Sequence, residues 1–212
     1  MIVGPRVRDD GPVPSRRIRT GERDAALRTV VAAFRADPQL RWYFPDDDRY
    51  DAGAPAFFGT LLDTRIEGGE VWVTPGLEAV AMWVPPGGNL LGPDVVEARY
   101  GETVAALPPP APERVAATDV LVDALLPREP HWYLGVLATH PASRGRGLAS
   151  DVLAPVLAAA DRAGFAAALE TSTPANVDFY ARRGFAALGQ GAVDGPGSPT
   201  VRVLLREPAR VP

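Results

Sequence analysis

Apolar residues recur along the chain at two spacings, which predict helices and short strands. A helical spacing of apolar residues predicts helices over residues 19–36, 54–66 and 148–160. Short apolar runs bounded by glycine or proline predict strands instead. The predicted strands cover residues 71–73, 79–84, 132–137, 165–170 and 200–205, with a hairpin turn at Pro75-Gly76 between the first two.

Residues that break regular structure lie between these segments, where they are expected to end, interrupt or cap helices. They are Asp37-Pro38, Gly68-Gly69, Pro108-Pro109-Pro110 inside an otherwise helical region of residues 94–126, the helix start Thr173-Pro174, and Gly184. We predict one α+β domain with a mixed sheet over residues 16–209, after a loose N-terminal tail over residues 1–15.

Composition narrows the classes of function. The net charge of the 212 residues is −4, without any lysine-rich arm, which speaks against nucleic-acid binding. The chain has no cysteine and two histidines, so disulfides, thiolate metal sites and a cysteine nucleophile are excluded and no metal is expected. It has no apolar run long enough to cross a bilayer and no signal-peptide core near Met1. We expect a cytoplasmic protein without membrane or nucleic-acid partners.

A short turn rich in glycine and arginine predicts an anion site. It is Arg144-Gly145-Arg146-Gly147, and it lies between the strand at residues 132–137 and a helix that begins with Leu148, Ala149 and Ser150. The first N–H groups of a helix have no intrahelical partner, and the helix dipole favours negative charge there. Glycine lets the backbone close around a ligand, and arginine offers forked donors to phosphate oxygens. We therefore expect the turn to hold a pyrophosphate.

Two classes of ligand carry a pyrophosphate to such a turn. The first is a dinucleotide such as NAD, because Glu170 follows Gly145 and Gly147 by about twenty residues at the end of the next strand. This interpretation predicts an oxidoreductase. Three details weaken it: Ser150 stands at the third glycine position, arginines flank both glycines, and no second βαβ half follows. The second class is an acyl-coenzyme A.

The hypothesis that the turn binds an acyl-coenzyme A depends on a family resemblance. Arg144, Gly147 and Ala149 have the Arg/Gln-x-x-Gly-x-Gly/Ala spacing of the GNAT superfamily of acyl-CoA N-acyltransferases, which this region resembles. Asn176 followed by Phe179-Tyr180 and Gly184-Phe185 is similar to the end of the same motif region. More narrowly, the order of these motifs resembles the puromycin N-acetyltransferases and their relatives. The resemblance is strong over residues 131–188 and implies a mixed, mostly antiparallel central sheet flanked by helices in a single domain.

The resemblance also implies a reaction and a cofactor. An acetyl group would pass directly from acetyl-CoA to a primary amine of a small molecule, with CoA as product. The backbone of Leu137, Ala138 and Thr139 would pair with the pantetheine arm, and Asn176 would bond to the pantetheine amide. A catalytically inactive acyl-CoA-binding domain is the remaining alternative to a transferase, and the resemblance leaves the oligomeric state open.

Two residues are expected to move protons. Tyr180 lies four residues after Asn176 on the same helix face, and its phenol, with an ordinary pKa of ~10, is protonated at neutral pH. The resemblance implies that Tyr180 is the general acid that protonates the departing thiolate. Glu170 is expected to act as the general base toward the amine, or else to be an ion-paired carboxylate at a strand end.

An aromatic and acidic cluster is the candidate acceptor pocket. The resemblance implies that the loop between the first two helices walls this pocket, and aromatic rings with carboxylates would suit an amphipathic cationic amine. The alternative is a hydrophobic anchor followed by a solvated acidic turn. The candidate residues are Trp42, Tyr43, Phe44 and Asp46 to Asp48 in the loop, with Phe57 and Trp83.

Overall fold

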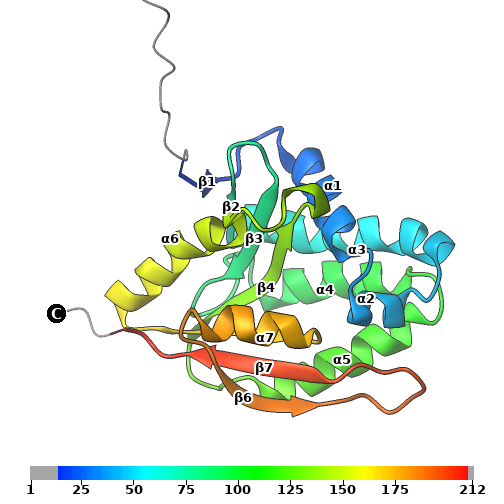
Figure 1. Cartoon of the computed structure of the whole chain (residues 1–212). Coiled ribbons are helices and arrows are strands. Elements are labelled where there is room, and N and C mark those ends of the chain that lie inside the picture. The colour runs from blue at the N-terminus through cyan, green and yellow to red at the C-terminus, as the bar shows by residue number, and fades with distance from the viewer. Residues whose placement is uncertain (1–13, 210–212) are drawn as a thin grey trace, which may run out of the picture.

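A seven-stranded sheet runs through the part of the chain that the computed structural model describes, residues 14–209 (Figure 1). The strand order is β1-β2-β3-β4-β5-β7-β6, and each neighbouring pair is antiparallel except β4–β5. This confirms the mixed, mostly antiparallel α+β fold. The strands are β1 (Arg16–Arg17), β2 (Glu70–Val73), β3 (Ala79–Val84), β4 (His131–Thr139), β5 (Ala166–Thr171), β6 (Ala186–Gly191) and β7 (Val201–Arg206). The predicted tail over residues 1–15 lies outside the described residues, apart from Pro14 and Ser15.

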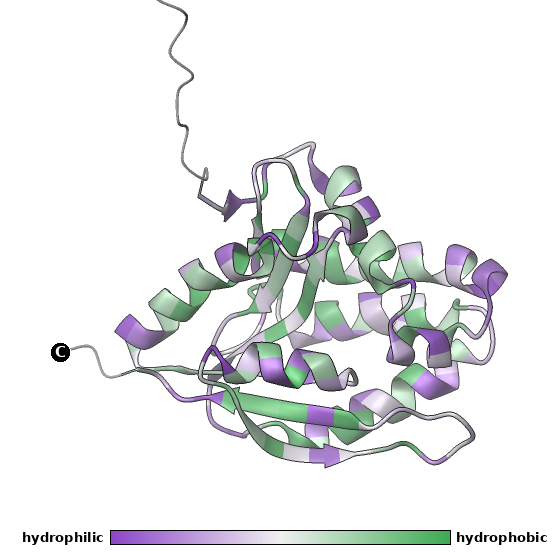
Figure 2. Cartoon of the chain, viewed as in Figure 1, coloured by the Kyte–Doolittle hydropathy of each residue, from purple (hydrophilic) through white to green (hydrophobic). Residues whose placement is uncertain are grey.

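Helices cover both faces of the sheet. One face packs against the first five helices through residues such as Val80 and Val136, and the other packs against the last two through Trp83 and Leu134. Figure 2 shows the apolar residues gathered on the central strands, while the helices alternate between apolar and polar positions. None of the described helices is both long and apolar enough to span a membrane. The helices are α1 (Arg23–Phe34), α2 (Pro38–Tyr43), α3 (Asp47–Gly68), α4 (Pro93–Ala105), α5 (Ala111–Leu125), α6 (Leu148–Ala163) and α7 (Pro174–Ala181), with a short 3-10 turn at Pro141–Ser143.

The segment predicted as an aromatic loop is instead a short helix, α2, followed at once by α3. The Asp37 side chain accepts hydrogen bonds from the backbone N–H groups of Gln39 (2.9 Å) and Leu40 (3.2 Å), which starts α2. The Asp46 side chain accepts from the N–H of Arg49 (2.8 Å) and starts α3, seven residues earlier than residue 54, where the sequence predicted it. The acidic run is therefore a helix cap and first turn.

Strand β4 carries an irregularity that opens the middle of the sheet. Its register with β3 pairs Met82 with Val136 but Trp83 with Leu134, so Gly135 is an extra residue on β4. β5 pairs with β4 only as far as Leu134, although β4 continues to Thr139. Beyond Leu134, the β5-facing edge of β4 therefore has no partner strand within the described sheet. This gap between β4 and β5 is where the site lies.

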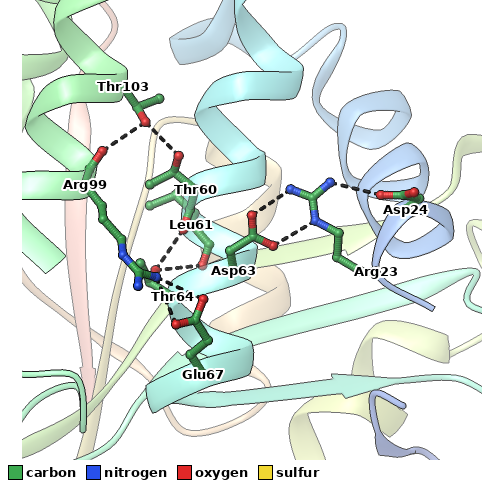
Figure 3. A network of polar contacts seen from close by, with 9 residues as sticks. All are labelled: Arg23, Asp24, Thr60, Leu61, Asp63, Thr64, Glu67, Arg99 and Thr103. Carbon is green, nitrogen blue, oxygen red and sulfur yellow. Dashed lines mark hydrogen bonds and ion pairs between the residues drawn. The ribbon is translucent and has the colours of Figure 1, made fainter. Parts of the chain in front are cut away.

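The outer side of α3 is tied to its neighbours by ion pairs and hydrogen bonds (Figure 3). Arg23 of α1 holds both oxygens of Asp63 at 2.7 Å, and Arg99 of α4 holds both oxygens of Glu67 at 2.9 Å. These contacts fix the orientation of α3, which forms one wall of the site.

Candidate active site

The turn before α6 presents an array of backbone donors. Gly145 and Gly147 have φ values of +78° and +83°, which L side chains rarely adopt. Within residues 14–209, the N–H groups from Gly145 to Ala149 donate to no protein acceptor, whereas the N–H of Ser150 donates to the carbonyl of Gly147 at 2.8 Å. Consecutive free N–H groups at a helix start form an anion site.

A cavity of about 640 Å³ opens along this turn and is called here the turn cavity. Arg144 lines it and donates to the carbonyl of Ala33 at 2.9 Å, while Arg183 lines it and donates to the Ser150 hydroxyl. The predicted cofactor residues that line it are Leu137, Thr139, Arg144, Gly145, Gly147, Leu148, Ala149, Ser150 and Asn176. Ala138 is instead buried on the side of α1–α5, and Arg146 lies outside the lining, 3.9 Å from Glu78.

A second cavity, of about 380 Å³, lies between β4, β5 and helices α2 to α5 and is called here the inner cavity. Tyr43 of α2, Phe57 of α3 and Glu170 of β5 line it. Leu137, Asn176 and Tyr180 line both cavities. The two cavities therefore meet at the gap between β4 and α7.

Glu170 is a half-buried carboxylate with one protein partner in the inner cavity. The Tyr133 hydroxyl donates a hydrogen bond to Glu170 Oε2 at 2.6 Å. Burial raises the pKa of Glu170 to about 7, although the hydrogen bond from Tyr133 acts in the opposite direction. A carboxyl group with this pKa exchanges a proton near neutral pH, as a general base must. Burial and the nearby Glu170 raise the pKa of Tyr133 as well, so its phenol stays protonated.

Tyr180 lies where the two cavities meet. Its ring packs edge-on between Phe179 and Phe185, at centroid distances of 5.2 and 5.6 Å, and it is 6% exposed. Its hydroxyl has no hydrogen-bond partner among the described residues, and burial raises its pKa above the ordinary value. The phenol is therefore protonated and available to a ligand. The Asn176 Nδ2 donates to Thr171 Oγ1 at 3.1 Å, which fixes the amide over the same junction.

Comparison with known proteins identifies the fold around this junction. Residues 110–185, which hold the turn, Glu170, Asn176 and Tyr180, match the family model described as the Acetyltransferase (GNAT) family. Over these residues the chain matches a GNAT acetyltransferase domain, and it is an acyltransferase. The matched residues do not include α1 to α4, which form much of the inner cavity.

Solved structures resemble the chain over nearly its whole length. A protein from Corynebacterium glutamicum described as histone acetyltransferase HPA2 and related acetyltransferase is 24% identical, with 95% of this chain and 99% of that chain covered and a TM-score of 0.67. Arylalkylamine N-acetyltransferase 2 from Aedes aegypti is 12% identical, with 91% and 97% covered and a TM-score of 0.61. An agmatine N-acetyltransferase is 14% identical, with 91% and 98% covered and a TM-score of 0.57. At these identities the likeness concerns the fold.

Part of the predicted acceptor cluster lies away from the inner cavity. Trp42 packs against Arg114, whose guanidinium lies 5.0 Å from the ring centroid. Phe44 is fully buried in the core, and Asp46 caps α3 and pairs with Arg49. Trp83 lies on the opposite face of the sheet, which packs against α6 and α7. Tyr43 and Phe57 are thus the two predicted acceptor residues that line the cavity.

Other residues of the inner cavity were not predicted from the sequence. Asp119 of α5 lies four residues after the buried Val115 and three before the buried Val122, so a carboxylate on the apolar stripe of α5 was an available signal. The Tyr100 hydroxyl donates a hydrogen bond to Asp119 Oδ1 at 3.4 Å. Arg65 of α3 carried a similar signal, because it lies three residues after the buried Leu62 and seven after the buried Phe58.

Proposed function

We propose that the protein transfers the acetyl group of acetyl-CoA directly to the primary amine of a small molecule. The observation that carries the proposal is the meeting of the two cavities at Leu137, Asn176 and Tyr180, with Glu170 on the inner side. A donor in the turn cavity and an acceptor in the inner cavity would meet at this junction. Such placement lowers the barrier because the reacting groups no longer have to find one another.

The turn cavity has the groups that an acyl-CoA needs. The free N–H groups from Gly145 to Ala149, with Arg144 and Arg183, would hold the pyrophosphate. The edge of β4 beyond Leu134 has unpaired backbone groups to which the pantetheine arm could bond as an added strand. The bound thioester supplies the acyl group, and a backbone N–H near Leu137 is our candidate for polarising its carbonyl oxygen.

The inner side supplies the proton transfers. Glu170 would accept a proton from the acceptor ammonium, so that a neutral amine attacks. As the C–S bond breaks, Tyr180 would donate its phenolic proton to the sulfur that leaves, and the proton lost by the attacking nitrogen would restore the phenol. Asn176 would orient the pantetheine amide. The cavity's volume of about 380 Å³ and its aromatic walls suit a small molecule rather than a protein segment. A cytoplasmic location, where acyl-CoA would be at hand, is part of the same proposal.

The alternative hypothesis, a dinucleotide-binding oxidoreductase, has less support. A doubly wound fold places nucleotides at the ends of parallel strands, and within residues 14–209 only β4 and β5 are parallel. Glu170, which would have to bind a ribose, is already bonded to Tyr133 and faces the inner cavity.

The first test is calorimetric titration with acetyl-CoA and, separately, with NAD, followed by an assay for release of CoA thiol with a panel of primary amines. We expect micromolar binding of acetyl-CoA, no binding of NAD, and release of thiol that depends on the amine. Arg144→Gln should weaken acetyl-CoA binding by about tenfold, the loss of one charge-assisted contact. Arg128→Gln, an exposed arginine paired with Asp123, is the matched control and should bind normally.

Each contrary result is distinct. Binding of acetyl-CoA without thiol release for any amine would indicate an inactive acyl-CoA-binding domain. Binding of NAD alone would overturn the assignment of the turn. Equal loss of affinity in Arg144→Gln and Arg128→Gln would mean that general charge, not the turn, attracts the ligand.

A further inference from the structure

A buried arginine lines the inner cavity, and it has no role in the transfer reaction proposed above. Arg65 of α3 is 9% exposed and lines the inner cavity. No carboxylate between residues 14 and 209 lies within ion-pair distance of it. Its Nη1 donates to the Leu61 carbonyl at 3.3 Å and to the Thr64 hydroxyl at 3.2 Å, and its buried Nε has no partner. A buried guanidinium bonded only to neutral oxygens is costly unless an anion joins it.

The nearest acids in the sequence are held elsewhere. Asp63 and Glu67 flank Arg65 on α3, but they face outward and form two-point contacts with Arg23 and Arg99 (Figure 3). Arg65 therefore has no carboxylate partner on its own helix. Its positive charge is therefore available to a ligand in the inner cavity.

The free end of the guanidinium lies beside the bulge of β4. A Cβ atom placed on Gly135 would lie 3.2 Å from Arg65 Nη2, so the bulge glycine of β4 leaves room for this group. Gly135 lines the inner cavity but not the separate cavity on the far side of Arg65, near Arg17 and Arg19. Nη2 makes no hydrogen bond with any described residue. It is thus the donor that a ligand in the inner cavity would reach.

The other charges of the cavity favour a ligand with both signs of charge. The acids that line the cavity are Asp37, Glu97, Asp119, Asp123 and Glu170, and burial raises the pKa of Glu170 to about 7. Glu170 serves the amine in the proposed reaction. An acceptor with an amine alone would leave Arg65 without an anion in contact with it, because Glu170 acts on Arg65 from beyond ion-pair distance.

We propose that Arg65 binds a carboxylate of the acceptor, so that the acceptor is an amino acid or a similar aromatic amine with an anionic group. The carboxylate would lie between Arg65 and the Gly135 bulge, and the amine would lie beside Glu170. The apolar part would lie against rings such as Phe57 and Tyr43, which line the same cavity. This inference rests on the proposed function and adds the acceptor's class to it.

The test compares acceptors that differ by one carboxylate, such as phenylalanine with phenethylamine and tyrosine with tyramine. We expect the wild-type kcat/KM to be at least tenfold higher for the acid of each pair. Arg65→Met should lower kcat/KM about 100-fold for the amino acids and less than threefold for the simple amines. Arg65→Lys should recover part of the preference, because it keeps the charge without the fork. Arg162→Gln, which removes an exposed arginine from the last turn of α6, outside both cavities, should keep the full preference.

A second measurement does not depend on the variants folding. Phenylpropanoate, which has the ring and the carboxylate but no amine, should inhibit the wild-type enzyme competitively against the acceptor, and phenylpropanol should inhibit at least tenfold more weakly. Equal inhibition, equal wild-type rates within each pair, or an equal loss for both members in Arg65→Met would overturn the inference but leave the transferase proposal intact. Absence of transfer to every amine, with acetyl-CoA bound, would overturn the proposed function itself.

Discussion

The two cavities of this domain are built in different ways. The turn cavity takes its polar groups mainly from one continuous segment, Gly145 to Ala149, and they are backbone N–H groups. The inner cavity takes its polar groups from side chains on seven separate elements, among them Arg65 of α3, Asp119 of α5 and Glu170 of β5. One site is a local backbone structure, and the other is assembled by the tertiary fold.

This difference predicts different sensitivities to mutation. A backbone site is changed by substitutions that alter the main-chain conformation, above all at glycines with positive φ. A side-chain site is changed by removal of single atoms, such as one hydroxyl or one carboxylate oxygen. The following substitutions test the contrast.

The largest effect is expected from Tyr180→Phe, which removes one oxygen at the junction. Loss of a general acid lowers turnover by ~10²–10⁴. The affinity for acetyl-CoA should stay within about twofold, because the binding groups that we propose lie in the turn. Steady-state kinetics and calorimetry on the same sample give both values.

The control for this substitution is Tyr50→Phe. Tyr50 is also fully buried, and its hydroxyl donates to the Val31 carbonyl at 2.7 Å in the core, away from both cavities. Its loss should cost about 1 kcal/mol of folding free energy and leave turnover unchanged. Unchanged turnover in Tyr180→Phe, or an equal fall in both variants, would remove Tyr180 from the reaction.

Glu170→Gln should produce the second largest effect and should depend on pH. The raised pKa of about 7 means that the base is protonated and inactive below that pH, so turnover should rise as the pH increases from about 6 to about 8. An ordinary glutamate would complete this rise near its usual pKa of ~4.3. In Glu170→Gln we expect turnover about 100-fold lower at pH 8 and no rise with this pKa. A pH profile identical to that of the wild type would exclude the base role.

The same contrast explains which features could be predicted from the sequence. The turn, the β4 strand, α6 and the Asn176 to Tyr180 helix are local, because apolar periodicity and glycine positions determine them without distant partners. The structure confirms these elements. The role of each residue in the turn remains a prediction.

The acceptor side could not be predicted in this way. Asp46 to Asp48 look like a charged patch in the sequence, but Asp46 caps α3 and Asp47 pairs with Arg41. Trp83 lies on the face of β3 that is opposite the inner cavity, where it packs near Trp132. Arg65 becomes a cavity residue only because α3 packs beside the bulge of β4. No local pattern contains that contact.

A backbone substitution should have an intermediate effect. Gly147→Ala places a side chain at φ +83°, which costs about 1–2 kcal/mol for an L residue. If the strain shifts the N–H groups of the turn, acetyl-CoA binding should weaken about tenfold while kcat at saturation changes little. Gly164→Ala is the matched control, since Gly164 ends the same helix at φ +72° with open space around it. That variant should lose similar stability and bind normally, and equal binding by both variants would contradict the backbone site.

The smallest expected effect concerns the hydroxyl of Tyr133. Its hydrogen bond at 2.6 Å stabilises the charged form of Glu170 and so lowers the pKa of that carboxyl. Tyr133→Phe should therefore raise this pKa and move the rise in turnover to higher pH. A rise of about one unit would lower the deprotonated fraction at pH 7 from about one half to about one tenth, which is an about fivefold loss of turnover.

High pH should restore the activity of Tyr133→Phe, because Glu170 is still present and is then deprotonated. Glu170→Gln should not recover at any pH, so the two variants separate positioning of the base from loss of the base. A pH profile measured at saturating acceptor makes this comparison for the bound state. A uniform loss across the whole pH range in Tyr133→Phe would mean that the phenol shapes the inner cavity instead of adjusting the charge on Glu170.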